Sequence, residues 1–286
     1  MFATLSRSWE FAKLSFGILL DFKQLIFFPI ISTFAFLVIT ASFFAPLWAF
    51  GVLDAWFRSA EQGGAAGEVM MWLTLLIFYF VAYFIMAFFN TGLIACTMKV
   101  LDGQSPTIPY GITVATRRLP QIAGWALVAA VVGVLLRMLE RNQKVGALIT
   151  ALIGTAWSAL TFFVVPVLAI EGVGPITAIK RSGGILRQHW GTALVSNFSV
   201  GLIGFLVMLP VLLLGIALIA MAVTAGNTVG VVLSVALVVL TVFIVSSAVS
   251  AADVILKAVL YNYATDKSVP AGFDPTHLED AFRPKD

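Results

Sequence analysis

Polar residues inside the apolar part of the chain are the first candidates for chemistry. Asp253 is the one acidic residue within a stretch that is expected to cross a bilayer, and a carboxylate in a membrane commonly marks a functional site. Lys257 follows at i+4, the favoured order for an ion pair along a helix. The sequence therefore leaves two interpretations, a structural pair or an ion or proton site. The polar neighbours that would serve such a site in a helix bundle are Ser246, Ser250, Asn90 and Asn197.

Basic residues form a second set of candidates, because they gather where apolar stretches end. Two such clusters follow the second and the fourth apolar stretch, and they contain Arg117, Arg118, Lys180, Arg181 and Arg187. A lysine or arginine near the membrane surface contributes about 1 kcal/mol to the attraction of anionic lipid. We therefore expect these side chains to contact lipid headgroups.

The motifs of known catalytic and cofactor-binding centres are missing from the sequence. It contains no HExxH, no GxSxG and no phosphate-binding glycine loop, and no paired carboxylates lie at helical spacing within an apolar stretch. His189 and His277 are isolated, and the single cysteine, Cys96, can form neither an intramolecular disulfide nor a thiolate cluster. We expect a protein that is not an enzyme and that has no cofactor and no metal.

Composition places the chain in a membrane. Hydrophobic residues make up 60% of the 286 residues and charged residues 11%, whereas a soluble domain has about 25% charged residues. Asp21 and Lys23 interrupt the first apolar run, which excludes a cleaved signal peptide of the usual pattern. The expected partners are membrane lipids, anionic headgroups among them, and no nucleic acid, and homo-oligomerisation is left open.

Six apolar stretches are expected to cross the membrane as helices. They cover residues 25–50, 69–99, 125–139, 145–170, 192–223 and 229–263. The predicted fold class is all-α, a polytopic transmembrane helix bundle of six spans with in-plane amphipathic helices on the cytoplasmic side. Those in-plane segments are expected at residues 2–19, in the stretch that ends at Arg117 and Arg118, and at 174–190. Residues 51–67 are expected to form a polar loop.

The last in-plane segment, residues 174–190, has a distinct pattern. Its apolar residues fall on one side of a helix, and they are Ile176, Ile179, Leu186 and Trp190. Its polar residues fall on the other side, and they are Thr177, Lys180, Arg181, Arg187 and Gln188. Two adjacent glycines, Gly183 and Gly184, favour a hinge or a break in the middle of this segment.

Orientation follows from the distribution of lysine and arginine. With six spans, the side that holds both termini carries thirteen of these residues and the other side carries four. Because cytoplasmic segments carry the excess, both termini are expected in the cytoplasm and the protein in the plasma (inner) membrane. Residues 1–265 are expected to form a single transmembrane domain, with weakly repeated hairpins at about 1–100, 101–172 and 173–265. Residues 266–286 are expected to form a short cytoplasmic tail.

A longer motif extends over the end of the fourth stretch and the segment after it. Residues 157–182 follow the pattern WS..TFFVVPVLA.EG.GP....KRS, and residues 261–264 and 272–274 add YNYA and GFD. The chain thereby resembles a family of uncharacterised prokaryotic six-span integral membrane proteins over nearly its whole length. The resemblance implies the architecture, and it lends no catalytic or binding residue.

Two functions are compatible with these features. The first is a non-enzymatic integral membrane protein with a scaffold or lipid-associated role at the cytoplasmic leaflet, in which the basic segments meet anionic headgroups. The second is a channel or transporter for a small solute or ion, with polar groups of the spans lining a path. The first explains the dominant features and is preferred. The second explains Asp253, but the spans carry few polar residues for a hydrated path.

Overall fold

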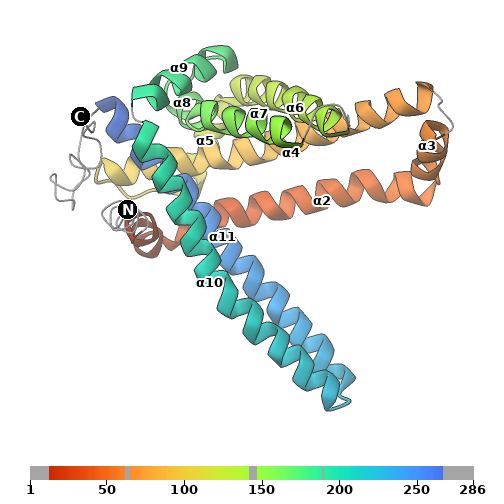
Figure 1. The fold of residues 1–286 in the computed structure, drawn as a ribbon. Helices are drawn as coiled ribbons and strands as arrows, with labels where there is room; N and C mark the ends of the chain where they lie inside the picture. The colour runs from red at the N-terminus through yellow and green to blue at the C-terminus, as the bar shows by residue number, and fades with distance from the viewer. Residues whose placement is uncertain (1–12, 62–64, 142–146, 189, 267–286) are drawn as a thin grey trace. The chain divides into compact units, whose positions relative to one another are not determined.

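The computed structural model describes residues 13–61, 65–141, 147–188 and 190–266. All regular elements within these residues are helices, which confirms the predicted all-α class (Figure 1). Six of the described helical segments are long and apolar enough to cross a membrane. They are Lys23–Ala49, Ala65–Leu101, Leu119–Glu140, Ile149–Ile170, Gly204–Thr224 and Thr228–Thr265. Of the N-terminal in-plane segment, residues 13–21 are helical, and the rest lies outside the described residues.

The chain divides into two compact units, and each is assembled from separate parts of the sequence. The first unit contains residues 1–30, 96–108 and 188–286. The second contains residues 31–95 and 109–187. The predicted single domain, its repeated hairpins and the tail at 266–286 stay predictions, and the tail beyond residue 266 lies outside the described part of the chain.

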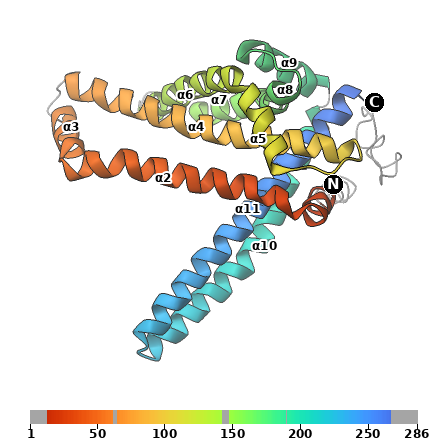
Figure 2. The same cartoon turned by 180° about the vertical axis from the view of Figure 1, so that it is seen from behind.

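Helices α2 (Phe27–Ala49) and α4 (Ala65–Leu101) lie side by side in the second unit (Figure 2). Their contact is aromatic: the ring of Phe78 lies 5.8 Å from that of Phe36 and 5.2 Å from that of Phe44, centroid to centroid. Neither helix has a marked polar face, so both need neighbours or lipid on all sides. This arrangement is the one expected of two adjacent spans.

The expected loop between these spans is wrong, because residues 52–61 form helix α3 (Val52–Glu61). Gly51 adopts a φ of +67°, a conformation that reverses the chain after α2 and that glycine adopts without strain. Asp54 in the first turn and Arg58 in the last turn complement the helix dipole. Local charge placement therefore favours a helix where the low hydropathy had indicated a loop.

Five further helices belong to the second unit. They are α5 (Ile108–Arg117), α6 (Leu119–Arg141), α7 (Ala147–Leu160), α8 (Val164–Ile170) and α9 (Pro175–Gln188). Helices α6 and α7 pack together, with the indole rings of Trp125 and Trp157 stacked 6.0 Å apart. The tight approach of α4 and α6 needs Gly133, because a Cβ there would lie 2.9 Å from the Tyr79 ring.

The fourth span was expected as one continuous helix, and it is divided between α7 and α8. Pro166 has no N–H and its ring clashes with the carbonyl four residues before it, at Phe162. The chain turns at residues 161–163, where the Phe162 and Val164 amides bond to carbonyls three residues back. The Phe163 amide donates instead to Ser182 Oγ at 3.0 Å. Both residues are buried, so the break is closed by a side chain of α9.

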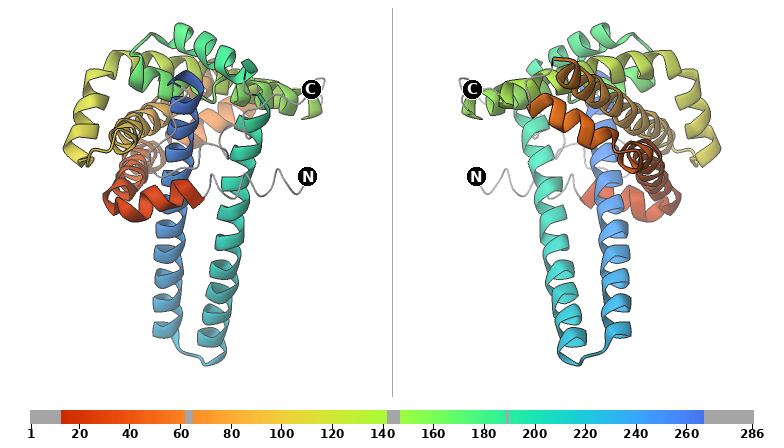
Figure 3. Two further views of the ribbon diagram at one scale, coloured as in Figure 1. Left: turned by 90° about the vertical axis from the view of Figure 1, so that its left-hand side faces the viewer. Right: turned by 90° about the vertical axis from the view of Figure 1, so that its right-hand side faces the viewer.

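Helices α10 (Trp190–Thr224) and α11 (Thr228–Asp266) form a long antiparallel hairpin in the first unit (Figure 3). Gly226, with a φ of +64°, permits the turn, and Asn227 Oδ1 accepts the Gly230 N–H at 2.9 Å to cap α11. Two glycines allow the helices to approach closely. A Cβ at Gly204 would lie 2.7 Å from Val249, and one at Gly215 would lie 2.7 Å from Val238.

The two ends of α11 have different surroundings. Towards its C-terminal end the residues Ala252, Ile255 and Leu260 are buried, and the helix contacts the 3₁₀ turn η1 (Lys23–Ile26). Nearer the hairpin turn, Val229, Leu233 and other large apolar side chains are more than half exposed. Such exposure is stable only where the surrounding solvent is itself apolar, as in a bilayer.

Candidate functional site

The beginning of α6 is bound to the end of α8. Arg118 Nε donates to the carbonyl of Ala169 and Nη2 donates to that of Ile170, both at 3.3 Å. Gln121 Nε2 donates to the Gly172 carbonyl at 3.1 Å. The final carbonyls of a helix have no partners within it and carry partial negative charge, so a guanidinium suits them in geometry and in charge. The start of the third span and the end of the fourth therefore lie at one end of the second unit.

Gly172 allows this contact. Its φ is +68°, in the left-handed region that follows many helices. A Cβ at this position would also overlap the Arg118 guanidinium. Two independent requirements, backbone conformation and space, therefore select glycine here.

The exit from α8 is joined to α9 by an ion pair. Arg181 Nε lies 3.1 Å from Glu171 Oε1 across the short connection between the two helices. Pro175, the first residue of α9, packs against α6, because a Cβ at Gly124 would lie 3.2 Å from Pro175 Cγ. Both contacts position α9 at the same end of the unit as Arg118.

Helix α9 is amphipathic, but its buried face differs from the expected one. Ala178, Ser182, Ile185 and Leu186 are buried, whereas Ile176 is 58% exposed. Of the expected hinge or break at Gly183 and Gly184, the break is wrong, since α9 is continuous from Pro175 to Gln188. A Cβ at Gly183 would lie 2.7 Å from Leu160 Cδ1, so this glycine permits close packing of α9 on α7.

The five basic residues selected from the sequence have different surroundings. Arg117, Lys180, Arg181 and Arg187 are exposed, and Arg181 also bonds to Glu171. Arg118 is half-buried and bonded to carbonyls, a structural role that the sequence did not indicate. Arg117 ends α5 directly before α6 begins, which places it at the same end of the unit as α9. Helices α5 and α9 thus carry the exposed basic side chains, and the Arg118 junction lies at the same end of the unit.

The second set of candidates centres on α11. Lys257 Nζ lies 2.6 Å from Asp253 Oδ2, and each side chain is less than a third exposed. Ser246 and Ser250 are exposed, while Ser247, which the sequence did not single out, is buried. Asn90 is half-buried in α4 of the other unit, and Asn197 lies in α10 with its side chain outside the described residues. Within the described residues, no group of three or more His, Cys, Asp and Glu side chains could hold a metal ion.

Comparison with known proteins identifies a family. No curated protein and no solved structure matches the chain. Residues 69–272, which extend from the early part of α4 past the end of α11, match a protein family that has no assigned function. The match covers well over half of the 286 residues and agrees with the resemblance to an uncharacterised family. The chain therefore belongs to the family described as "Family of unknown function (DUF6159)".

Proposed function

We propose that this chain is a non-enzymatic integral membrane protein with a lipid-associated role, in which α5 and α9 bind anionic headgroups at the cytoplasmic leaflet. The main support comes from α9. It begins five residues after α8 ends, buries Ala178, Ile185 and Leu186, and keeps its basic side chains exposed. A short helix with one buried face and one cationic face, placed at the end of a span, suits the interface between lipid and water.

The basic side chains of α5 and α9 lie at the same end of the unit. The bonds between Arg118 and the end of α8 bring the start of α6 to the start of α9. Arg117, Lys180 and Arg187 are then exposed at one end of the unit, with Arg181 beside them. At about 1 kcal/mol for each cation near an anionic surface, this group gives a preference of a few kcal/mol for anionic lipid.

The cytoplasmic placement of these helices rests on the thirteen-to-four distribution of basic residues. It includes both termini in the cytoplasm and a location in the plasma (inner) membrane. A phosphatase that is active only outside the cytoplasm should therefore be inactive when fused after residue 286, and a fluorescent protein fused there should fold. Phosphatase activity without fluorescence would reverse the orientation.

Transport remains the alternative, and it depends on Asp253. The carboxylate is bonded to Lys257, which supports the structural interpretation of this pair. Lipid association therefore explains more of the molecule's features.

Headgroup selectivity tests the proposal directly. In proteoliposomes of the full-length protein, spin-labelled phosphatidylglycerol should associate more strongly than spin-labelled phosphatidylcholine, and the preference should decline with salt because exposed charges are screened. The double variant Lys180→Gln with Arg187→Gln should lose most of this preference. Arg58→Gln, which removes an exposed cation on α3, is the matched control and should retain it. An undiminished preference in the double variant would contradict the proposal.

A further inference from the structure

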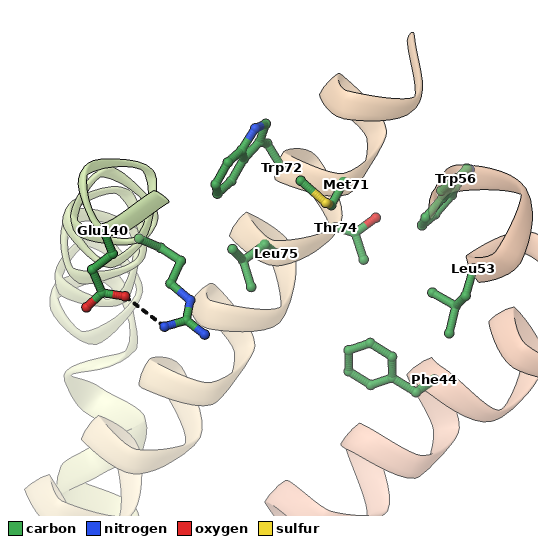
Figure 4. Close-up of a pocket in the computed structure, with 9 residues that line it drawn as sticks. Phe44, Leu53, Trp56, Met71, Trp72, Thr74, Leu75 and Glu140 are labelled. Carbon is green, nitrogen blue, oxygen red and sulfur yellow. Dashed lines mark hydrogen bonds and ion pairs between the residues drawn. The ribbon is translucent and has the colours of Figure 1, made fainter. Parts of the chain in front are cut away.

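A pocket of about 630 Å³ is lined by residues of α2, α3, α4 and α6 (Figure 4). Its α6 residues, Arg137 and Glu140, belong to the last turns of that helix, whereas Arg118 directly precedes the first turn, so the pocket and the Arg118 junction lie at opposite ends of α6. Phe44 comes from the last turns of α2, Leu53 and Trp56 come from α3, and Trp72 and Leu75 come from the first turns of α4. Figure 4 shows the residues of α2 and α3 across the pocket from those of α4. The volume is within the range of about 300–1,000 Å³ that is typical of small-molecule sites.

The charged part of the pocket is an ion pair near the end of α6. Arg137 Nη1 lies 2.7 Å from Glu140 Oε2, and both residues line the pocket (Figure 4). The Arg137 side chain is 64% exposed and that of Glu140 49% exposed. An exposed pair of this kind is weak, so a ligand with matching charges can separate the two groups at little cost.

The position of the pocket indicates which molecules can reach it. Phe44, Trp72 and Leu75 belong to the ends of the spans formed by α2 and α4, and α3 connects these ends. The charges of the pocket lie where the span in α6 ends. The pocket is therefore placed at the boundary between the acyl chains and the headgroups of one leaflet. The molecules with an apolar part and a polar part at this depth are lipids, and Trp56 and Trp72 are residues typical of this boundary.

The headgroup must decide which lipid binds. An acyl chain that enters the pocket leaves other acyl chains, so its transfer provides little hydrophobic driving force. Arg137 offers several N–H donors to a phosphate, and Glu140 offers an acceptor to an N–H group. A lipid with a net negative headgroup would satisfy Arg137 but would be repelled by Glu140. A trimethylated ammonium could not donate a hydrogen bond to that carboxylate.

We propose that this pocket binds a phosphoethanolamine lipid from the surrounding leaflet. An acyl chain lies between Phe44, Trp56 and Leu75, the phosphate meets Arg137, and the primary ammonium meets Glu140. This site does not depend on the basic helices α5 and α9, which lie at the other end of the unit.

Lipid titrations of the delipidated full-length protein test the site, with bound lipid measured by native mass spectrometry. Three lipids with identical acyl chains are compared, bearing phosphoethanolamine, its trimethylated form or phosphoglycerol. The primary ammonium lipid should bind about tenfold more tightly than the other two, because it alone forms charge-assisted hydrogen bonds with both residues. Equal binding of the three lipids would overturn the proposal.

Single variants test which part of the headgroup each of the two charged residues binds. Glu140→Gln should remove the difference in affinity between the primary and the trimethylated ammonium lipid. Arg137→Gln should weaken the binding of all three lipids. Arg58→Gln, on α3 but outside the pocket lining, is the control and should behave as the unmodified protein does. Both pocket variants change exposed side chains, so circular dichroism should show an unchanged fold. A preference for the primary ammonium that persists in Glu140→Gln would overturn the assignment.

A second measurement locates the acyl chain. Phosphoethanolamine lipid with brominated chains should quench part of the tryptophan fluorescence, and Trp56→Phe with Trp72→Phe should remove that part. Quenching that is unchanged in the double variant would place the chain elsewhere and would also overturn the proposal. Variants of Lys180 and Arg187 should affect neither measurement, which separates this site from the proposed cytoplasmic contact.

Discussion

Ser182 Oγ accepts the N–H of Phe163 at 3.0 Å, and this bond joins α9 to the break in the fourth span. Both residues are buried. Ser182→Ala removes the acceptor from a buried amide, and the expected loss is about 1–3 kcal/mol in the free energy of unfolding. Unfolding in mixed micelles with increasing SDS measures it. Thr177→Ala, on the exposed side of α9, is the control and should change stability by less than about 0.5 kcal/mol.

Gly172→Ala should destabilise the junction between α6 and α8. The new Cβ meets both the positive φ and the Arg118 guanidinium, and the backbone contribution alone costs about 1–2 kcal/mol. Gly184 is the matched control, because it is helical and has nothing within 4 Å of a Cβ. Gly184→Ala should leave stability unchanged or raise it by up to about 1 kcal/mol. Similar effects of the two substitutions in the same unfolding assay would contradict this account of Gly172.

The α10 and α11 hairpin should respond to Gly215→Ala through Val238. A Cβ at Gly215 lies 2.7 Å from Val238 Cγ2, so the helices must separate or the valine must move. Val238→Ala in the same chain removes the obstructing methyl groups and should restore stability. A double-mutant cycle should give a coupling of at least about 0.5 kcal/mol between the two sites. Additive effects would mean that the contact does not limit the approach of the helices.

The pair of Asp253 and Lys257 yields a prediction about single and double variants. Asp253→Asn or Lys257→Gln leaves one charge in the spanning helix without its partner at 2.6 Å, and each should destabilise the protein. The double variant removes both charges and should be at least as stable as either single variant. An Asp253→Asn protein that is fully stable but has lost an ion flux measured in proteoliposomes would instead favour the transport alternative.

The spans were predictable because their signal is local: about twenty apolar residues suffice to cross a bilayer. The pairing of Asp253 with Lys257 was predictable for the same reason, since four residues along a helix fix their proximity. The missed features depend on contacts between distant segments. The carbonyls bound by Arg118 lie 51 and 52 residues away, and no spacing along the chain indicates them. The close packing at Gly183 likewise depends on a distant residue, Leu160 of α7.

The pocket was missed because its residues come from four helices, and α3 had been expected as a loop. Arg137 and Glu140 occur at i and i+3, a spacing that indicates a helical ion pair and gives no sign of apolar residues opposite. The helical spacing of apolar and charged residues in 52–61 was the signal that could have identified α3 as one wall of the pocket. Leu53 and Trp56 fall on one face there, while Asp54 and Arg58 lie outside the pocket lining.

No carboxylate takes part in the side-chain bonds of the Arg118 junction, which run from Arg118 and Gln121 to backbone carbonyls. The bonds from Arg118 end on backbone carbonyls, which do not titrate, and a guanidinium keeps its charge under all conditions that a cell meets. The connection between the third and fourth spans is thus built from groups whose charge and hydrogen-bonding capacity acid does not alter.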